Sequence, residues 1–242
     1  MAHDQTSSDS LAVRLAAEAK LRVVPRDADD PVHELVLPLR EFFTTEPGAG
    51  FSIVDVNGLI WYVNRRSAEM FLETSRPEDL IGRSLVDLYG DLWAAERIAA
   101  FREILRSGKP VVVRHIRNGQ RLQSTIRVIT APDVTPARFS VLTTLGRHEV
   151  DPADGFHVME SDLVHLGPLE SLTHRELEVL ALVGHGMTSV QIGETLFRSP
   201  RTIEQHLSSI REKLHAASRI EIAGYAQRAG LTLSDADRIR LH

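Results

Sequence analysis

Cysteine is missing from this chain of 242 residues. Without thiols there is no thiolate nucleophile, no cysteine-bound zinc and no cysteine-linked chromophore. Long apolar runs are missing too, since none approaches the roughly 18 residues that cross a membrane as a helix. The first ten residues have neither the basic start nor the apolar core of a signal peptide. The sequence therefore predicts a cytoplasmic protein with no membrane partner.

Motifs for catalysis and for metal binding are absent as well. The sequence has no nucleophile elbow, no phosphate-binding loop and no paired-histidine motif, so we expect no enzyme and no metal site. Three histidines, His148, His157 and His165, stand near acidic residues, but their spacing fits neither one face of a helix nor a known set of ligands. A solvated acidic segment explains them better.

Basic residues are missing from residues 148–170, which carry six acidic residues, interspersed Gly and Pro, and no regular apolar period. This composition predicts a linker. The whole chain has a net charge of −5, but from Arg198 to Arg219 five basic residues stand against two acidic ones. A locally positive segment suits contact with phosphate. Because the excess is small, we expect affinity for a nucleic acid to depend on the pairing of two copies.

Length and composition allow two domains of ordinary size, since 43% of the residues are hydrophobic. We predict an α+β chain in five parts. Residues 1–39 form a leader with a flanking helix, 40–147 a mixed domain, 148–170 the acidic linker, 171–230 an all-α domain and 231–242 a C-terminal tail.

Signals for helix starts are concentrated in residues 171–230. In three places an oxygen-bearing residue stands three positions before Glu or Gln, as in a reciprocal capping box. Ser199 followed by Pro200 marks a further start. The domain is therefore predicted to contain four short helices. The three pairs are Thr173/Glu176, Thr188/Gln191 and Ser218/Glu221.

The second and third of these helices, at about residues 189–196 and 200–214, are separated by the short turn of a helix-turn-helix. The third helix has one apolar face, predicted to pack, and one polar face, predicted to be free. Gly193 gives the second helix no side chain at one position, which we expect to let the third helix cross closely. The apolar face consists of Ile203, Leu207, Ile210 and Leu214.

The segment 172–226 resembles the LuxR-type DNA-binding domain at the C-terminus of many bacterial transcription regulators. The resemblance implies that residues 200–214 are the recognition helix and that the last helix helps to pair two copies. Two departures, Glu204 where Lys is frequent and Gly193 where Ala is usual, leave the base sequence open. The matching residues are Leu172, Thr173, Arg175, Glu176, Glu178, Val179, Leu180, Gly186, Ile192, Leu196, Ser199, Pro200, Thr202, His206, Lys213, Leu214, Ser218 and Arg219.

The exposed face of the recognition helix supplies the candidate DNA contacts. In a helix-turn-helix the N-terminal half of this helix reaches the base edges. Gln can bond adenine, Arg guanine, and Glu can accept from cytosine. We therefore predict base reading by Arg201, Glu204, Gln205 and Ser208, and contacts with the DNA backbone by Arg198, Thr202, His206, Arg211 and Lys213.

Strand signals begin at Phe51. Apolar runs flank Asn57-Gly58 and again Asn118-Gly119, a dipeptide that favours hairpin turns because both residues can adopt positive φ. Asn64 and Asp91 are predicted to cap the helices between the two hairpins. Two strands, helices and three further strands describe a five-stranded antiparallel sheet with helices on one face.

Residues 40–147 are similar to the PAS sensor domain, through an Asp-x-Asn-Gly hairpin, the Val-Asn that closes it and an Ile-Gly at 81–82. The resemblance implies that the helical side of the sheet can hold a small-molecule ligand, a cofactor or a partner protein, and that the domain often pairs. The cofactor, if any, is unknown. His115 has the strand parity of Val111 and Val113, which makes it a candidate haem ligand, although a lone histidine on a strand is usually structural.

Two other classes of regulator are open alternatives. A phosphoacceptor receiver often precedes LuxR-type domains, and Asp55 imitates its acceptor. Only 25 residues separate Asp30 from Asp55, too few for the parallel α/β sheet of a receiver. An acyl-homoserine-lactone receptor has a similar length, but Trp61 and Tyr62 are adjacent rather than spaced as in that class.

The acidic linker suggests a regulatory hypothesis. Six acids close to a positive recognition segment could lie against the DNA-binding face in the unsignalled state and compete with DNA at close range. Under this hypothesis, deletion of residues 149–163 raises DNA affinity at low salt.

Overall fold

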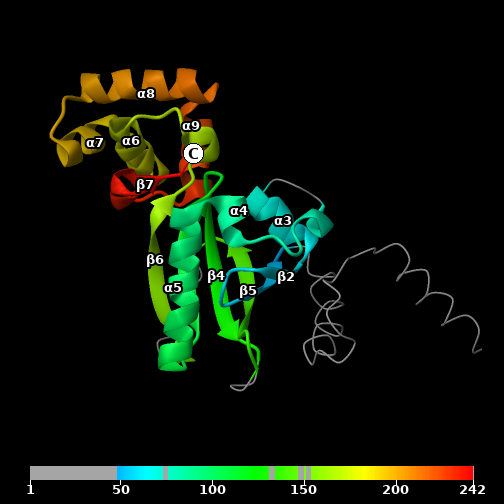
Figure 1. Cartoon of the computed structure of the whole chain (residues 1–242). Helices are drawn as coiled ribbons and strands as arrows, with labels where there is room; N and C mark the ends of the chain where they lie inside the picture. The colour runs from blue at the N-terminus through cyan, green and yellow to red at the C-terminus, as the bar shows by residue number, and fades with distance from the viewer. Residues whose placement is uncertain (1–47, 73–75, 131–133, 147–149, 151–153, 242) are drawn as a thin grey trace, which may run out of the picture.

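The computed structural model describes residues 48–72, 76–130, 134–146, 150 and 154–241. The leader and flanking helix predicted in residues 1–39 lie outside this part. The described residues form a sheet with helices along one face and a cluster of helices at one end (Figure 1). No helix within these ranges is long and apolar enough to cross a membrane.

The first hairpin joins β1 (Gly50–Asp55) and β2 (Ile60–Val63), which pair antiparallel as predicted. At its turn Gly58 has a φ of 87°, but Asn57 does not share the positive φ that the sequence predicted. The Asp55 carboxylate instead accepts hydrogen bonds from the backbone N–H groups of Asn57 (2.9 Å) and Leu59 (3.0 Å). An aspartate side chain thus shapes the turn in place of a second left-handed residue.

Helices follow the hairpin: α3 (Arg65–Leu72), the short 3-10 helix η1 (Pro77–Asp79), α4 (Leu85–Tyr89) and α5 (Asp91–Ser107). Asn64 caps α3 as predicted, because its Oδ1 accepts the N–H of Ser67 at 2.8 Å. The prediction for α5 is wrong by one residue: Gly90 is the N-cap and Asp91 is already helical. Phe101 of α5 stacks on Phe139 of the sheet with ring centroids 4.6 Å apart, which holds α5 against the sheet.

Strands β3 (Val111–Arg117), β4 (Gln120–Val128) and β5 (Arg138–Leu145) pair antiparallel, and β5 returns to pair with β1. At the β3–β4 turn both Asn118 (φ 50°) and Gly119 (φ 63°) are left-handed, as predicted. The order β2-β1-β5-β4-β3 provides the five antiparallel strands expected from the PAS resemblance. It is incompatible with the parallel sheet of a receiver, so Asp55 does not occupy a phosphoacceptor site of that kind.

Two further strands extend this sheet. β6 (His157–Val164) pairs parallel with β3, and β7 (Ile239–Arg240) pairs parallel with β6. The sheet therefore has seven strands, and the prediction of five is wrong. Residues 157–164, expected to be an irregular linker, have no regular apolar period but lie along the open edge of β3. The backbone groups of an edge strand pair with another strand whatever its side chains are.

The C-terminal part contains the four predicted helices: α6 (His174–Gly184), α7 (Ser189–Leu196), α8 (Pro200–Leu214) and α9 (Arg219–Ala229). The capping boxes that open α6 and α7 are reciprocal. At α9, Ser218 accepts the N–H of Glu221, but the Glu221 carboxylate accepts the N–H of Ala217 at 2.9 Å, so the third box is not reciprocal. The 3-10 helices η3 (Gly167–Leu169) and η4 (Leu233–Asp237) connect this part to β6 and β7.

The end of the sheet contributes to the apolar core of the C-terminal helices. Ile116 at the end of β3 and Val164 at the end of β6 belong to the same buried cluster as Leu177 of α6 and Ile203 of α8. The C-terminal helices therefore lie at the end of the sheet, with α8 on the side farthest from it (Figure 1).

Candidate nucleic-acid interface

The turn between α7 and α8 is held by backbone contacts. Phe197 ends α7 with a φ of 54°, and the N–H of Arg198 donates to the carbonyl of Gly193 at 2.8 Å. A Cβ on Gly193 would lie 2.6 Å from the carbonyl oxygen of Arg198. Gly193 thus makes room mainly for the backbone of the turn, rather than for a close crossing of α8 as expected. Ser199 then caps α8 by accepting the N–H of Thr202 at 3.1 Å.

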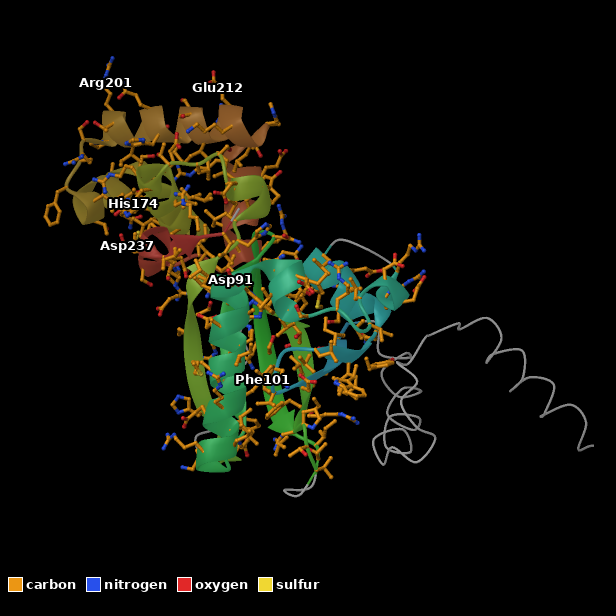
Figure 2. The ribbon with its side chains drawn as sticks, in the orientation of Figure 1. Asp91, Phe101, His174, Arg201, Glu212 and Asp237 are labelled. Atoms are coloured by element: carbon orange, nitrogen blue, oxygen red, sulfur yellow. The ribbon has the colours of Figure 1, made fainter. Side chains whose placement is uncertain are left out.

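α8 has the two faces that its sequence predicts. Its apolar residues Ile203, Leu207, Ile210 and Leu214 are buried. The opposite face is exposed, and in Figure 2 Arg201 and Glu212 point away from the rest of the molecule. A shallow hollow runs along this outer face and is lined by Arg201, Glu204, Gln205, Ser208, Ser209 and Glu212.

The four predicted base-reading residues lie together on this outer face, but their surroundings differ. Within the described part of the chain, Arg201 and Gln205 are exposed and make no polar contact. Ser208 donates its hydroxyl to the backbone carbonyl of Glu204 at 3.0 Å. The Glu204 carboxylate accepts a short hydrogen bond from the hydroxyl of Ser189 on α7. Arg201 and Gln205 are therefore the side chains best placed to reach a ligand.

Ser189 and Arg219 are two residues whose roles the sequence analysis missed. The Ser189 Oγ that donates to Glu204 also accepts from Nη1 of Arg219 at 3.2 Å. Nη2 of Arg219 donates to the carbonyl of Met187 at 2.7 Å. The three side chains connect α9 to α7 and α7 to α8. The sequence analysis gives Arg219 a place in the LuxR-type resemblance and in the local positive charge but no contact, because contacts between helices are not visible in sequence spacing.

The five residues predicted to contact the DNA backbone differ in their exposure and in their contacts. Arg198 and Arg211 are exposed, whereas Thr202 and His206 are half-buried. Thr202 Oγ1 lies 2.8 Å from Oγ of Ser199, within the cap of α8. Lys213 is engaged inside the domain, where its Nζ donates to Glu176 at 2.6 Å.

Glu176 receives several hydrogen bonds at once. Besides Lys213, the Ser209 hydroxyl donates to it at 2.6 Å and the Thr173 N–H donates at 2.7 Å. Burial raises the pKa of the Glu176 carboxyl, but the hydrogen bonds from Lys213, Ser209 and Thr173 outweigh burial and lower this pKa to about 2. Glu176 therefore joins the start of α6 to α8. From the sequence, the capping box predicted only the contact of Glu176 with Thr173.

A second candidate site is a cavity of about 40 Å³ on the helical face of the sheet. Aromatic rings and one buried guanidinium, that of Arg97, form much of its wall. The complete lining is Ser52, Val54, Ile60, Val63, Ser67, Phe71, Leu80, Leu85, Tyr89, Trp93, Arg97, Phe101, Ser124, Ile126 and Val141.

His115, the candidate haem ligand, is a buried core residue. Its Nε2 lies 3.1 Å from the hydroxyl of Ser124, and its ring stacks on Phe71. Burial, reinforced by Arg97 and Arg117, lowers the pKa of His115 well below its ordinary value, so the imidazole is neutral. An engaged Nε2 and a cavity of about 40 Å³ do not fit a haem group.

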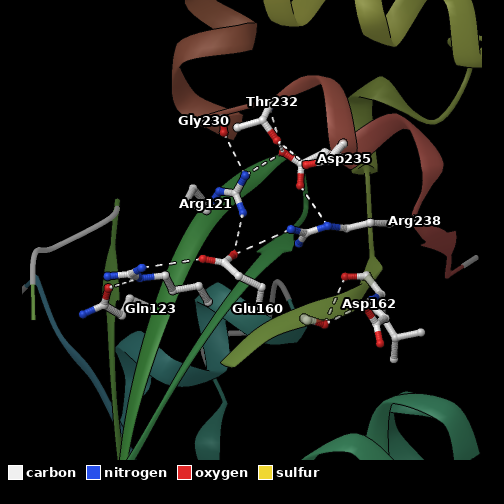
Figure 3. A network of polar contacts seen from close by, with 12 residues as sticks. Arg121, Gln123, Glu160, Asp162, Gly230, Thr232, Asp235 and Arg238 are labelled. Carbon is white, nitrogen blue, oxygen red and sulfur yellow. Dashed lines mark hydrogen bonds and ion pairs between the residues drawn. The ribbon is translucent and has the colours of Figure 1, made fainter. Parts of the chain in front are cut away.

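Of the acids in residues 148–170, Glu160 and Asp162 lie on β6 of the sheet rather than on the outer face of α8. Glu160 forms ion pairs with Arg114 (3.6 Å), Arg121 (3.8 Å) and Arg238 (3.6 Å), as Figure 3 shows for the last two. In this arrangement Glu160 does not cover the outer face of α8, and the competition hypothesis for residues 149–163 stays a prediction. Among the predicted linker histidines, His165 accepts the N–H of Asn118 at 3.2 Å. No group of three or more metal-ligating side chains occurs in the described ranges.

Comparison with known proteins places the C-terminal helices in a family. Residues 170–226 match the model of the bacterial regulatory proteins of the luxR family. The transcriptional regulatory protein LiaR of Bacillus subtilis is 46% identical over 61 residues, which are 25% of this chain and 29% of LiaR. The oxygen regulatory protein NreC of Staphylococcus carnosus is 41% identical over 59 residues, 24% of this chain and 27% of NreC. The similarity thus spans less than a third of each of these relatives.

A complex of Vibrio cholerae VqmA with a ligand and DNA is similar over a longer stretch. The match covers 84% of this chain and 92% of VqmA, with 23% sequence identity and a TM-score of 0.43. The family assignment rests on the C-terminal match instead: in residues 170–226 the chain contains a helix-turn-helix domain of the LuxR family of bacterial regulatory proteins.

Proposed function

We propose that this protein is a transcription regulator that binds a specific DNA sequence through α8 and adjusts this binding to a signal sensed by residues 40–147. The observation that carries the proposal is the outer face of α8. Its buried side fixes the helix in the domain core, while Arg201 and Gln205 extend outward without polar partners among the described residues. Side chains of these types distinguish guanine and adenine in the major groove.

Pairing of two copies through α9 fits the modest charge of the interface. Lys213 is paired with Glu176 and Arg219 with a backbone carbonyl, which leaves Arg198 and Arg211 for phosphate. Few phosphate contacts give weak binding. Two linked domains bind much more tightly than one. Ile220 on α9 is 84% exposed and is an apolar candidate for the contact between copies.

β6 supports coupling between the two parts of the chain. Glu96 of α5 accepts the Ser161 hydroxyl (2.8 Å) and the Asp162 N–H (3.0 Å), at the point where the pairing of β6 with β3 is interrupted. Val164, two residues after Asp162, belongs to the same apolar core as the DNA-binding helices. A signal that favours one arrangement of this junction would shift the population able to bind DNA.

Selection from random-sequence duplexes tests the proposal. The full chain is expected to enrich a two-fold symmetric motif with half-sites about 10 base pairs apart. Ile220→Glu should enrich only a single half-site, because it places a charge in the proposed contact between copies. Leu233→Glu, at another exposed apolar residue, is the control and should select as the parent does. Failure of the parent chain to enrich any motif would refute sequence-specific DNA binding.

A further inference from the structure

The guanidinium of Arg97 is only partly paired inside the cavity wall. Arg97 is 4% exposed, and its Nη1 donates to the neighbouring Glu96 at 2.5 Å. Its Nη2 is buried and has no hydrogen-bond partner within the described ranges. Buried polar groups of folded proteins are nearly always hydrogen-bonded. Arg97, in the cavity wall, therefore carries one strong donor that no described group accepts.

The charges around this donor favour an anion. Glu96 is the carboxylate paired with Arg97, and it is shared with the Ser161 hydroxyl and the Asp162 N–H of β6. A second guanidinium, that of Arg117, lies 5.1 Å from the ring centroid of Tyr89 in the cavity wall. Burial lowers the pKa of Arg97, Glu96 raises it, and Arg117 lowers it further. Arg97 and Arg117 both add positive potential at this donor, which favours a hydrogen-bond acceptor that carries negative charge.

The rest of the cavity wall contains no acidic residue and is largely aromatic, so it can accommodate both an anionic group and an apolar chain. Burial raises the pKa of Tyr89, so its phenol stays protonated and carries no negative charge. Phe71, Trp93 and Phe101 supply aromatic surface. Holding one water takes roughly 10–15 Å³ of such space, and an apolar cavity of about 150 Å³ holds benzene. A cavity of about 40 Å³ therefore fits a molecule smaller than benzene.

We infer that this cavity binds a small monocarboxylate with a short apolar chain, and that Arg97 is the residue that binds its carboxylate. The inference rests on the proposed sensing function and specifies the class of its signal. One carboxylate oxygen accepts from Nη2 of Arg97, and the chain packs on the aromatic rings. A charge-assisted hydrogen bond of this kind is about twice as strong as a neutral one. The cavity should therefore bind the carboxylate more tightly than a neutral molecule of the same size and shape.

Calorimetric titration of the full chain with propionate and propionamide, which share size and shape, tests this directly. Propionate is expected to bind saturably and at least about tenfold more tightly than propionamide, a difference of roughly 1.4 kcal/mol. Arg97→Gln should abolish the preference, and Arg97→Lys should keep part of it because the charge remains. Arg102→Gln, on the exposed side of the same helix, is the matched control and should titrate as the parent does.

Equal binding of the two probes, no saturable binding of propionate, or an unchanged preference in Arg97→Gln would each overturn the inference. The comparison on the parent chain needs no variant, so poor folding of Arg97→Gln does not obscure it. DNA binding is measured on the same samples. A parent chain that binds DNA but shows no preference for propionate rejects only this inference, whereas absence of sequence-specific DNA binding in the parent rejects the proposed function.

Discussion

Individual side chains on the outer face of α8 differ in how far they can adapt to DNA. Gln205 and Arg201 are exposed, so their rotamers can follow the base edges. Glu204 is restrained, because the Ser189 hydroxyl binds its carboxylate and is itself held by Arg219. A carboxylate fixed in one orientation repels phosphate and accepts only from a donor such as the cytosine amino group. If Glu204 reads a base as proposed, Ser189 is expected to affect base selection through it.

Substitution of Ser189 tests this restraint. Ser189→Ala releases Glu204 and is expected to reduce discrimination at the base pair nearest Glu204 by about 1 kcal/mol, with little change at other positions. Titrations against duplexes substituted at single base pairs measure the effect. Thr195→Ala is the matched control, since it removes another exposed hydroxyl of α7 that bonds only to the helix backbone. If Ser189→Ala lowers the affinity equally for all substituted duplexes, or leaves every affinity unchanged, Ser189 does not orient Glu204.

Among the helices, the contact between α6 and α8 depends on Glu176. The pKa of this carboxyl is about 2 in the folded domain, below its ordinary value of about 4.3. A depressed pKa contributes stability that is complete above the unfolded value and is lost as the pH falls toward the folded one. Glu176 thus stabilises the domain from neutral pH down to about pH 5, and the contribution disappears between about pH 5 and pH 2.

Glu176→Gln should therefore destabilise the chain near pH 7 by about 1.5–3 kcal/mol, the range for hydrogen bonds to a charged group. The difference from the parent chain should shrink steadily as the pH is lowered to about 2. Urea denaturation at a series of pH values measures it. Glu178→Gln, which breaks a more exposed ion pair with Arg175 on the same helix, should have a smaller effect. A difference that stays constant with pH would contradict the role given to the ionised carboxylate.

The helices were more predictable than the last two strands for a physical reason. Caps such as Thr173 and Ser199, and the apolar face from Ile203 to Leu214, act within a few residues, so their spacing determines the local structure. β6 and β7 arise instead from pairing with an available strand edge far away in the chain. The partners of Lys213 and Glu204 likewise come from other helices. The sequence could therefore place these residues on a surface but could not identify their contacts.

In the whole molecule, the junction between the sheet and the C-terminal helices contains a buried ion pair. Nη2 of Arg121, on β4, donates to Asp235 at 2.7 Å and to the carbonyl of Gly230 at 2.8 Å (Figure 3). Asp235 is 1% exposed and also pairs with Arg238 at 3.1 Å. Removal of one partner from a buried pair leaves an uncompensated charge. The two parts of the chain should therefore unfold together while Arg121 is present.

Arg121→Ala is expected to cost about 3–5 kcal/mol and to separate thermal unfolding into two transitions, one for each part. Differential scanning calorimetry of the full chain resolves this outcome. Arg127→Ala, on the exposed part of the same strand, should leave a single transition. If Arg121→Ala also unfolds in one transition at the parent temperature, the ion pair does not join the two parts.

The central claim, that the outer face of α8 reads DNA bases, is tested most directly by comparing Gln205→Ala with Arg211→Ala on the selected duplex and on random DNA at several salt concentrations. Both residues are exposed on α8, but Gln205 lies in the half expected to meet bases and Arg211 near the end expected to meet phosphate. Gln205→Ala should cost about 1–3 kcal/mol on the selected duplex and little on random DNA. Arg211→Ala should weaken both equally and reduce the salt slope by about one unit. Equal losses on both DNAs for Gln205→Ala would contradict the assignment of this face to base reading.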